Sequence, residues 1–281
     1  MDNFLHSYQH LPYHINPTIF KFGIFSLGWY SLMYLVAFLT VYLLLAYRLK
    51  KGEWDKGQKY DLEMISDFLL IVFVGLLIGG RIGYVLFYNF QYYAANPMAI
   101  ISPFDPATGA LVGIYGMSFH GGLLGGLLAA FIFIRKKKLD FWKFSDFVIP
   151  AVPAGYFFGR IGNFLNGELW GRATTKIWGM YFPGDTEGLL RHPSQIYEAL
   201  SEGLILFLIL WFLRNNPKTK GKLFGIFLAG YGAMRIASEF FRDPDPQIGY
   251  VFRYFTLGQL LSVPMIALGI ILVFQKRKSV V

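Results

Sequence analysis

An arginine near the end of an apolar segment could form part of an anion-binding site. The segment 159–168 has the sequence GRIGNFLNGE and follows the run 147–158, which is apolar enough to lie in hydrocarbon. Arg160 and Asn163 are three residues apart, so they share one face of a helix, which Asn166 continues. A guanidinium binds phosphate in bidentate geometry, and an asparagine amide both donates and accepts hydrogen bonds. A cation in hydrocarbon is costly, so an anion on another helix or on a bound ligand must meet Arg160.

A second arginine occurs in another apolar segment. Arg235 precedes Glu239 by four residues, and Tyr231 and Arg242 lie on the same helical stripe. Two cations in hydrocarbon favour a shared anionic target. Two structural alternatives are open. In one, Arg235 pairs with Glu239 and nothing else. In the other, Arg160 belongs to a cluster of polar side chains that holds helices together.

A histidine could supply acid–base chemistry. His120 lies in the segment 118–126, SFHGGLLGG, whose two glycine pairs spaced by four allow a neighbouring helix to pack closely. An imidazole accepts a proton near neutral pH, although a lone histidine is also often a structural residue. No second histidine lies at metal-ligand spacing and the chain has no cysteine, so we expect no metal site, no disulfide and no cysteine nucleophile.

The composition places these residues in a membrane protein. Hydrophobic residues make up 55% of the 281 residues and charged residues only 15%, against roughly 25% in ordinary soluble domains. The net charge of +9 comes from basic residues just beyond apolar segments, which argues against nucleic acid as a partner. Segments long enough to span a bilayer are 25–47, 65–88, 113–134, 146–166, 195–213, 223–241 and 256–274.

The basic residues also predict the orientation. Most of the 26 Lys and Arg residues follow the first, third, fifth and seventh segments, and such residues favour the cytoplasmic side. We therefore expect an all-α integral membrane protein with seven transmembrane helices, the amino terminus outside and the carboxy terminus in the cytoplasm. It would form one polytopic domain, 1–281. The cytoplasmic loops would be 48–64, 135–145 and 214–222, and the outward loops 89–112 and 167–194 would form a small cap.

Several of these segments together resemble the bacterial prolipoprotein diacylglyceryl transferase family. The blocks that carry the resemblance are 80–84 (GRIGY), 118–122 (SFHGG), 159–171 (GRIGNFLNGELWG), 192–195 (HPSQ) and 231–235 (YGAMR). The resemblance implies a multi-pass enzyme of the bacterial cytoplasmic (inner) membrane, whose active site faces the outer leaflet. Such an enzyme moves a diacylglyceryl group from phosphatidylglycerol to the lipobox cysteine of a prolipoprotein, forming a thioether and releasing glycerol phosphate.

The resemblance also implies a set of site residues. We expect the protein to be monomeric and to need no cofactor. The residues expected to be catalytic are Tyr30, His120, Arg160, Glu168, Arg235 and Glu239. The residues expected to bind phospholipid are Arg81, Arg160, Asn163, Asn166 and Arg235. Among these, His120 is the first choice for the base that accepts the thiol proton, with Glu168 or Glu239 as the alternative.

These observations favour a phosphate clamp. Arg160 and Arg235 would hold the phosphate, so the partner of Arg160 would be the substrate. Two other classes of function use the same residues: a lipid or anion transporter with the arginines along its permeation path, and a lipid-binding scaffold without catalysis.

Overall fold

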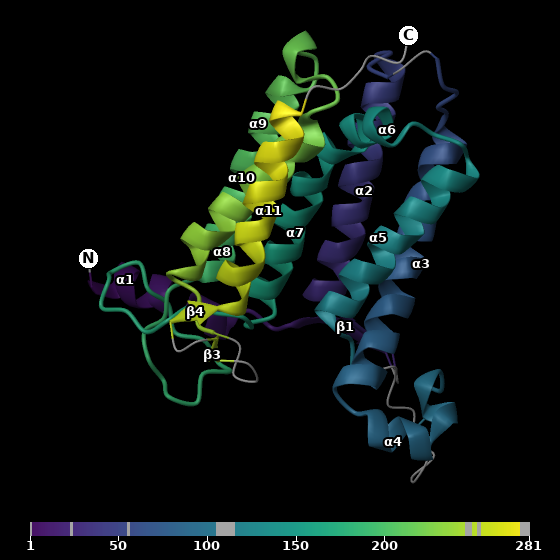
Figure 1. Ribbon diagram of the computed structural model, residues 1–281. Helices are drawn as coiled ribbons and strands as arrows, with labels where there is room; N and C mark the ends of the chain where they lie inside the picture. The colour runs from purple at the N-terminus through teal and green to yellow at the C-terminus, as the bar shows by residue number, and fades with distance from the viewer. Residues whose placement is uncertain are drawn as a thin grey trace. The chain divides into compact units, whose positions relative to one another are not determined.

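The chain is predominantly α-helical, and its described residues include two short two-stranded antiparallel sheets (Figure 1). The computed structural model describes residues 2–22, 25–54, 57–104, 116–244, 249–251 and 254–275. The chain forms two compact units. The first comprises Met1–Trp54 and Trp142–Val281, and the second comprises Asp55–Phe141. A single domain over 1–281 stays a prediction.

The first unit begins with short elements that lead into a long helix. These are α1 (Asp2–Gln9), the 3-10 turn η1 (Leu11–His14), strands β1 (Thr18–Phe22) and β2 (Phe25–Gly28), and α2 (Trp29–Lys50). The remaining elements are α6 (Phe141–Val148), η3 (Ile149–Ala151), α7 (Val152–Leu165), α8 (Ser194–Glu198), the π-helix η4 (Ala199–Ile205), α9 (Leu206–Leu213), η5 (Pro217–Thr219), α10 (Leu223–Glu239), β3 (Tyr250–Val251), β4 (Phe255–Thr256) and α11 (Leu257–Phe274).

Small residues decide how closely the helices of the first unit approach. A Cβ added to Gly155 of α7 would lie 3.0 Å from Val41, and one added to Gly162 would lie 3.1 Å from Met33, both in α2. These two glycines are seven residues apart and therefore lie on one stripe of α7. By contrast, nothing lies within 4 Å of a Cβ added to Gly159. The face of α7 that carries Gly155 and Gly162 packs against α2, and Arg160 lies on a different face of α7.

The second unit contains two long helices joined by shorter ones. Its elements are α3 (Leu62–Phe87), α4 (Phe90–Ala95), η2 (Pro97–Ile100) and α5 (Phe119–Lys136). A Cβ added to Gly121 would lie 2.9 Å from the Cα of Gly83, and one added to Gly125 would lie 2.8 Å from the Cα of Gly79. The predicted packing of backbone against backbone along the glycines of 118–126 is therefore confirmed.

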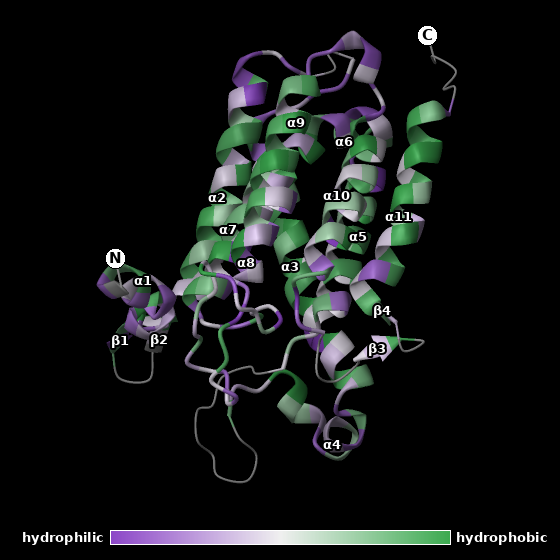
Figure 2. Cartoon of the chain, turned by 90° about the vertical axis from the view of Figure 1, so that its left-hand side faces the viewer, coloured by the Kyte–Doolittle hydropathy of each residue, from purple (hydrophilic) through white to green (hydrophobic). Residues whose placement is uncertain are grey.

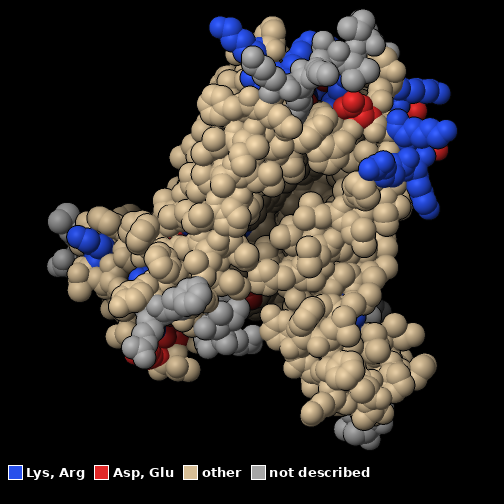
Figure 3. Space-filling model, in the orientation of Figure 1, with Lys and Arg blue, Asp and Glu red and all other residues tan. Residues whose placement is uncertain are grey.

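Among the described residues, five helical segments are long and apolar enough to cross a membrane. They are Trp29–Lys50, Leu62–Phe87, Phe119–Lys136, Ser194–Leu213 and Leu257–Phe274. Hydrophobic residues run along these helices while hydrophilic ones collect near their ends (Figure 2). In the space-filling view, Lys, Arg, Asp and Glu are almost absent from the visible helix flanks (Figure 3). The chain is thus a multi-pass membrane protein.

The two other predicted spans are helical but shorter. Helix α7 has 14 residues and α10 has 17, although α6, η3 and α7 follow one another without a break from residue 141 to residue 165. The count of seven spans therefore stays a prediction.

Two predicted helix starts need correction. The span 25–47 begins with strand β2 rather than helix, because residues 25–28 pair with β1 and satisfy their backbone hydrogen bonds there. A short apolar run does not distinguish strand from helix by its pattern. In the span 113–134, residues 113–115 lie outside the described residues, and α5 starts only at Phe119. Ser118 caps it, since its hydroxyl accepts a hydrogen bond from the Gly121 amide at 3.2 Å.

Candidate active site

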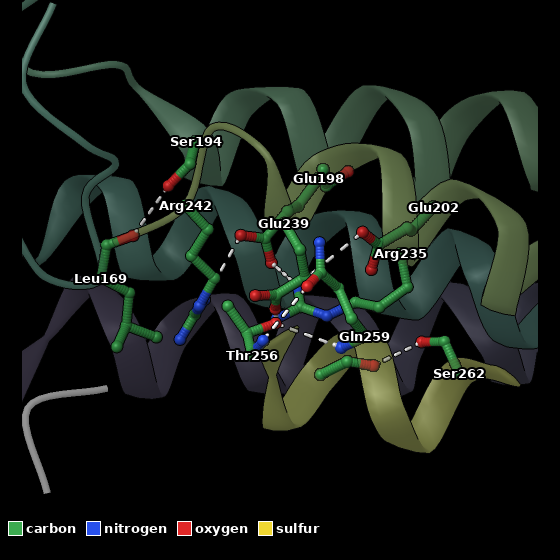
Figure 4. A network of polar contacts seen from close by, with 12 residues as sticks. Leu169, Ser194, Glu198, Glu202, Arg235, Glu239, Arg242, Thr256, Gln259 and Ser262 are labelled. Atoms are coloured by element: carbon green, nitrogen blue, oxygen red, sulfur yellow. Dashed lines mark hydrogen bonds and ion pairs between the residues drawn. The ribbon is translucent and has the colours of Figure 1, made fainter. Parts of the chain in front are cut away.

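A glutamate at the end of α8 is the centre of a buried ionic cluster. The side chain of Glu198 has no exposed surface, and its Oε2 lies 3.0 Å from the Nε of Arg160 and 2.8 Å from the Nη1 of Arg235. Its Oε1 lies 3.3 Å from the Nη1 of Arg242. Figure 4 shows Glu198 with Arg235 and Arg242. One carboxylate therefore contacts guanidinium groups from α7, from α10 and from the turn after α10.

Two more carboxylates face Arg235. Its Nη2 donates a hydrogen bond to Glu239, one turn further along α10, and its Nη1 lies 3.8 Å from Glu202 Oε1. A Cβ added to Gly258 would lie only 2.7 Å from the Cδ of Glu239. The glycine therefore leaves room for this carboxylate at the first turn of α11, where the positive end of the helix dipole stabilises it.

A chain of hydrogen bonds links Arg160 to its own helix and to the residues that follow it. The Nε of Arg160 donates to the Tyr156 hydroxyl at 2.7 Å, and its Nη1 donates to Asn163 Oδ1 at 3.3 Å. The Asn163 amide then donates to Glu168 Oε1 at 2.8 Å, and Tyr156 donates to Glu202 Oε2 at 2.5 Å. The face shared by Arg160 and Asn163 is thus confirmed, and both side chains are held in fixed orientations.

The π-helix brings the acidic side chains to the arginines. Glu198 directly precedes η4, which contains Glu202, and π-turns in helices often occur at functional sites. A Cβ added to Gly203 would lie 2.7 Å from the Cβ and 2.8 Å from the Cα of Phe157. Only a glycine allows η4 to pack this tightly against α7, and this close packing places Glu198 beside Arg160.

An anion on another helix was one of the two possible partners of Arg160, and the structure places such an anion beside it. The partner is Glu198, a carboxylate on another helix. Three arginines, Arg160, Arg235 and Arg242, meet three glutamates, Glu198, Glu202 and Glu239, so the described cluster is electrically neutral. Arg235 pairs with Glu239, as one of the structural alternatives predicted, but it also contacts Glu198 and Glu202.

The sequence reasoning missed Glu198 and Glu202. Both lie at the start of the apolar segment 195–213, four residues apart, a spacing that puts them on one helical face. An acidic pair at membrane depth is as costly as a buried arginine. The two glutamates could therefore be recognised in the sequence as an unusual acidic pair, but the sequence does not indicate which cation pairs with them.

Three other predicted site residues of the first unit lie near the ends of α7 and α2. The backbone carbonyl of Glu168 accepts a hydrogen bond from Gln195 at 2.7 Å, which ties the end of α7 to α8. Asn166 is the C-cap residue of α7. The Tyr30 hydroxyl, in the first turn of α2, donates to the Tyr34 hydroxyl at 3.1 Å.

The predicted residues His120 and Arg81 belong to the second unit. His120 is the second residue of α5 and is exposed within that unit. Arg81 donates to the backbone carbonyls of Ile100 and Ala99, each at 2.7 Å, and its guanidinium lies over the Tyr93 ring at 4.9 Å. These contacts anchor η2 to α3. Phospholipid binding by Arg81 stays a prediction.

The loop between α7 and α8 is held by its own ion pairs. Arg191 is buried, and its Nε and Nη2 donate to the two carboxylate oxygens of Asp185 at 2.8 and 3.0 Å. This hydrogen bonding holds the pKa of Asp185 below its ordinary value. Arg172 donates to the carbonyls of Arg242 and Glu239 at 2.9 and 3.3 Å, so it closes the C-terminal end of α10 beside the cluster.

A model of the prolipoprotein diacylglyceryl transferase family matches residues 17–275, which include every residue of the cluster. The chain belongs to this family. A phosphatidylglycerol–prolipoprotein diacylglyceryl transferase of Chlorobaculum tepidum is 48% identical over 99% of this chain and 96% of its own length. The proteins of the same name from Pseudoalteromonas atlantica and Legionella pneumophila strain Corby are 48% and 43% identical over 92% and 94% of this chain, and over 88% and 98% of their own lengths. Family membership therefore covers the whole arrangement around Glu198.

Proposed function

We propose that this protein transfers the diacylglyceryl group of phosphatidylglycerol to a prolipoprotein, as the names of its relatives state for those proteins. The transfer is a step of lipoprotein maturation. The observation that supports it most is the pair of arginines Arg160 and Arg235, whose side chains are only 12% exposed. They come from different helices and meet on one carboxylate oxygen. A phosphodiester oxygen could take the place of that oxygen between the same two guanidinium groups.

The reaction forms a carbon–sulfur bond and breaks a carbon–oxygen bond. The sulfur of the lipobox cysteine attacks the glyceryl carbon, the bond between that carbon and the phosphate oxygen breaks, and the leaving group is glycerol phosphate. Negative charge grows on the departing phosphate, where Arg160 and Arg235 stabilise it. Their fixed hydrogen bonds to Asn163, Tyr156 and Glu239 hold them in place before the substrate arrives.

The thiol must lose its proton during this attack, because the thiolate is the nucleophile. His120 is our first candidate for the proton acceptor, with Glu168 or Glu239 as the alternative. Tyr30, Asn166 and Arg81 complete the proposed set of site residues, the last two as further ligands of the phospholipid.

We further propose seven spans with the amino terminus outside, in a cytoplasmic (inner) membrane, with the site toward the outer leaflet. The distribution of the basic residues supports this orientation. An accessibility scan that found loop 135–145 outside the membrane would overturn the orientation.

The transfer can be tested with Arg235→Lys. Lysine keeps the charge but loses the planar fork that reaches Glu198 and Glu239 together. We expect formation of the thioether product on a lipobox peptide, in vesicles containing phosphatidylglycerol, to fall at least about tenfold, which corresponds to about 1.4 kcal/mol of transition-state stabilisation. Arg135→Lys, at an exposed position of α5, is the matched control and should keep full activity. Transport of phosphatidylglycerol without any thioether product would favour the transporter instead.

A further inference from the structure

Glu202 is a buried carboxylate for which the transfer reaction has no use. Its side chain has no exposed surface. Its Oε2 accepts the hydrogen bond from Tyr156, whereas its Oε1 has no hydrogen-bond partner among the described residues. The charged neighbour of Oε1 is Arg235, whose Nη1 is 3.8 Å away. A buried polar atom without a partner is costly, so Glu202 is the least stabilised carboxylate of the cluster.

The groups that face Glu202 come from each helix packed against η4. Tyr156 and Arg160 face it from α7, and Arg235 and Tyr231 face it from α10. Glu198 faces it from the preceding turn of its own helix. Helix α9 carries no titratable residue. The surroundings of Glu202 thus contain two permanent cations, two phenols and one further carboxylate.

Charge balance decides what a bound anion does to this carboxylate. The three arginines and three glutamates of the cluster cancel, and a phosphodiester adds one negative charge. An uncompensated charge has a high free energy in a region of low dielectric constant. A buried ionisable group therefore gains or loses a proton and becomes neutral. A protonated Oε1 would also become a hydrogen-bond donor, which removes the cost of its missing donor partner.

We propose that Glu202 takes up one proton from water when the phosphodiester headgroup binds Arg160 and Arg235. This inference rests on the function proposed above, because it needs the headgroup at the two arginines. Glu202 is then a positioning residue that compensates charge: it touches neither the thiol nor the glyceryl carbon. The proton that it takes up on binding returns to water when the phosphate leaves.

Proton uptake and affinity are linked. If binding takes up one proton, the affinity for phosphatidylglycerol falls about tenfold for each unit of pH in the range where Glu202 is ionised in the free protein and protonated in the complex. Glu202→Gln imitates the protonated acid. Its affinity should therefore be independent of pH and higher than that of the unchanged protein at alkaline pH.

Calorimetry can count the proton. The full-length protein in nanodiscs of phosphatidylcholine is titrated at pH 7 with short-chain phosphatidylglycerol in two buffers of different ionisation enthalpy. We expect uptake of about one proton per bound lipid in the unchanged protein, as the pH linkage requires, and uptake close to zero in Glu202→Gln. Glu187→Gln, a carboxylate 63% exposed in the outer loop, should leave the uptake unchanged.

The outcomes are separable. Binding without uptake in the unchanged protein, or equal uptake in Glu202→Gln, overturns this inference and leaves the transferase function standing. Absence of phosphatidylglycerol binding in the unchanged protein overturns the proposed function and this inference with it. If Glu202→Gln does not fold, Tyr156→Phe replaces it. The lost hydroxyl leaves Glu202 protonated before the lipid arrives, so the uptake should shrink, and an unchanged uptake contradicts the proposal.

Discussion

The Nε of Arg160 lies 3.0 Å from the Oε2 of Glu198, on a different helix. The protein thus neutralises its own buried cation before any lipid arrives. In the proposed function, a phosphodiester would compete with this carboxylate for the guanidinium, so binding would exchange one ion pair for another. Under that proposal, such an exchange would favour release of the leaving phosphate, because Glu198 could pair with Arg160 again.

Removal of the central carboxylate should destabilise the first unit. Glu198→Gln leaves Arg160, Arg235 and Arg242 without their shared anion, and breaking a buried ion pair on one side costs about 3–5 kcal/mol. We expect a marked drop in the thermal midpoint of the purified protein in detergent. Glu187→Gln should change stability by no more than about 1 kcal/mol, because Glu187 is 63% exposed and water screens its ion pair with Arg191. A variant at Glu198 as stable as the unchanged protein would mean that the cluster is not a structural anchor.

The close contact between η4 and α7 predicts a sensitive glycine. In Gly203→Ala, the new methyl group would meet the Cα of Phe157 at 2.8 Å, and the two helices must separate. We expect a loss of about 1–3 kcal/mol of stability, as for overpacking of a core, together with weaker transfer because Arg160 moves away from Glu198. Gly159→Ala is the control for stability, since nothing lies within 4 Å of its added Cβ. Equal stability of the two variants would contradict the packing described here.

The loop between α7 and α8 should lose stability in acid. The pKa of Asp185 is lower in the folded protein than in the unfolded chain, so the unfolded state binds more protons as the pH falls. The contribution of Asp185 is fully present above its ordinary pKa of about 3.9 and disappears as the pH falls through the lower folded value. We expect protection of the loop against proteolysis to decline below that pH. Asp185→Asn should lack this decline, and an identical pH profile in that variant would rule out the ion pair as its origin.

The amino-acid pattern predicted the helical segments well because long apolar runs have few alternative structures in a membrane. Arg160 and Arg235 stood out for the same reason, since a cation in such a run needs an explanation. The pattern could not assign the partner of Arg160, because Glu198 is distant in the chain and comes close only through Gly203 and the π-turn. The strand at 25–28 was missed because its pairing depends on β1, not on its own composition.

The contacts around Glu198 also constrain the biogenesis of the protein. Arg160 precedes Glu198 in the chain and Arg235 follows it, so the ribosome delivers the cation of α7 before its counter-ion and the cation of α10 after it. The segment of α7 carries no acidic side chain to balance Arg160 when it first leaves the translocation channel, whereas α10 carries Glu239 beside Arg235. We therefore expect the insertion machinery to retain the helix of Arg160 until α8 emerges with Glu198.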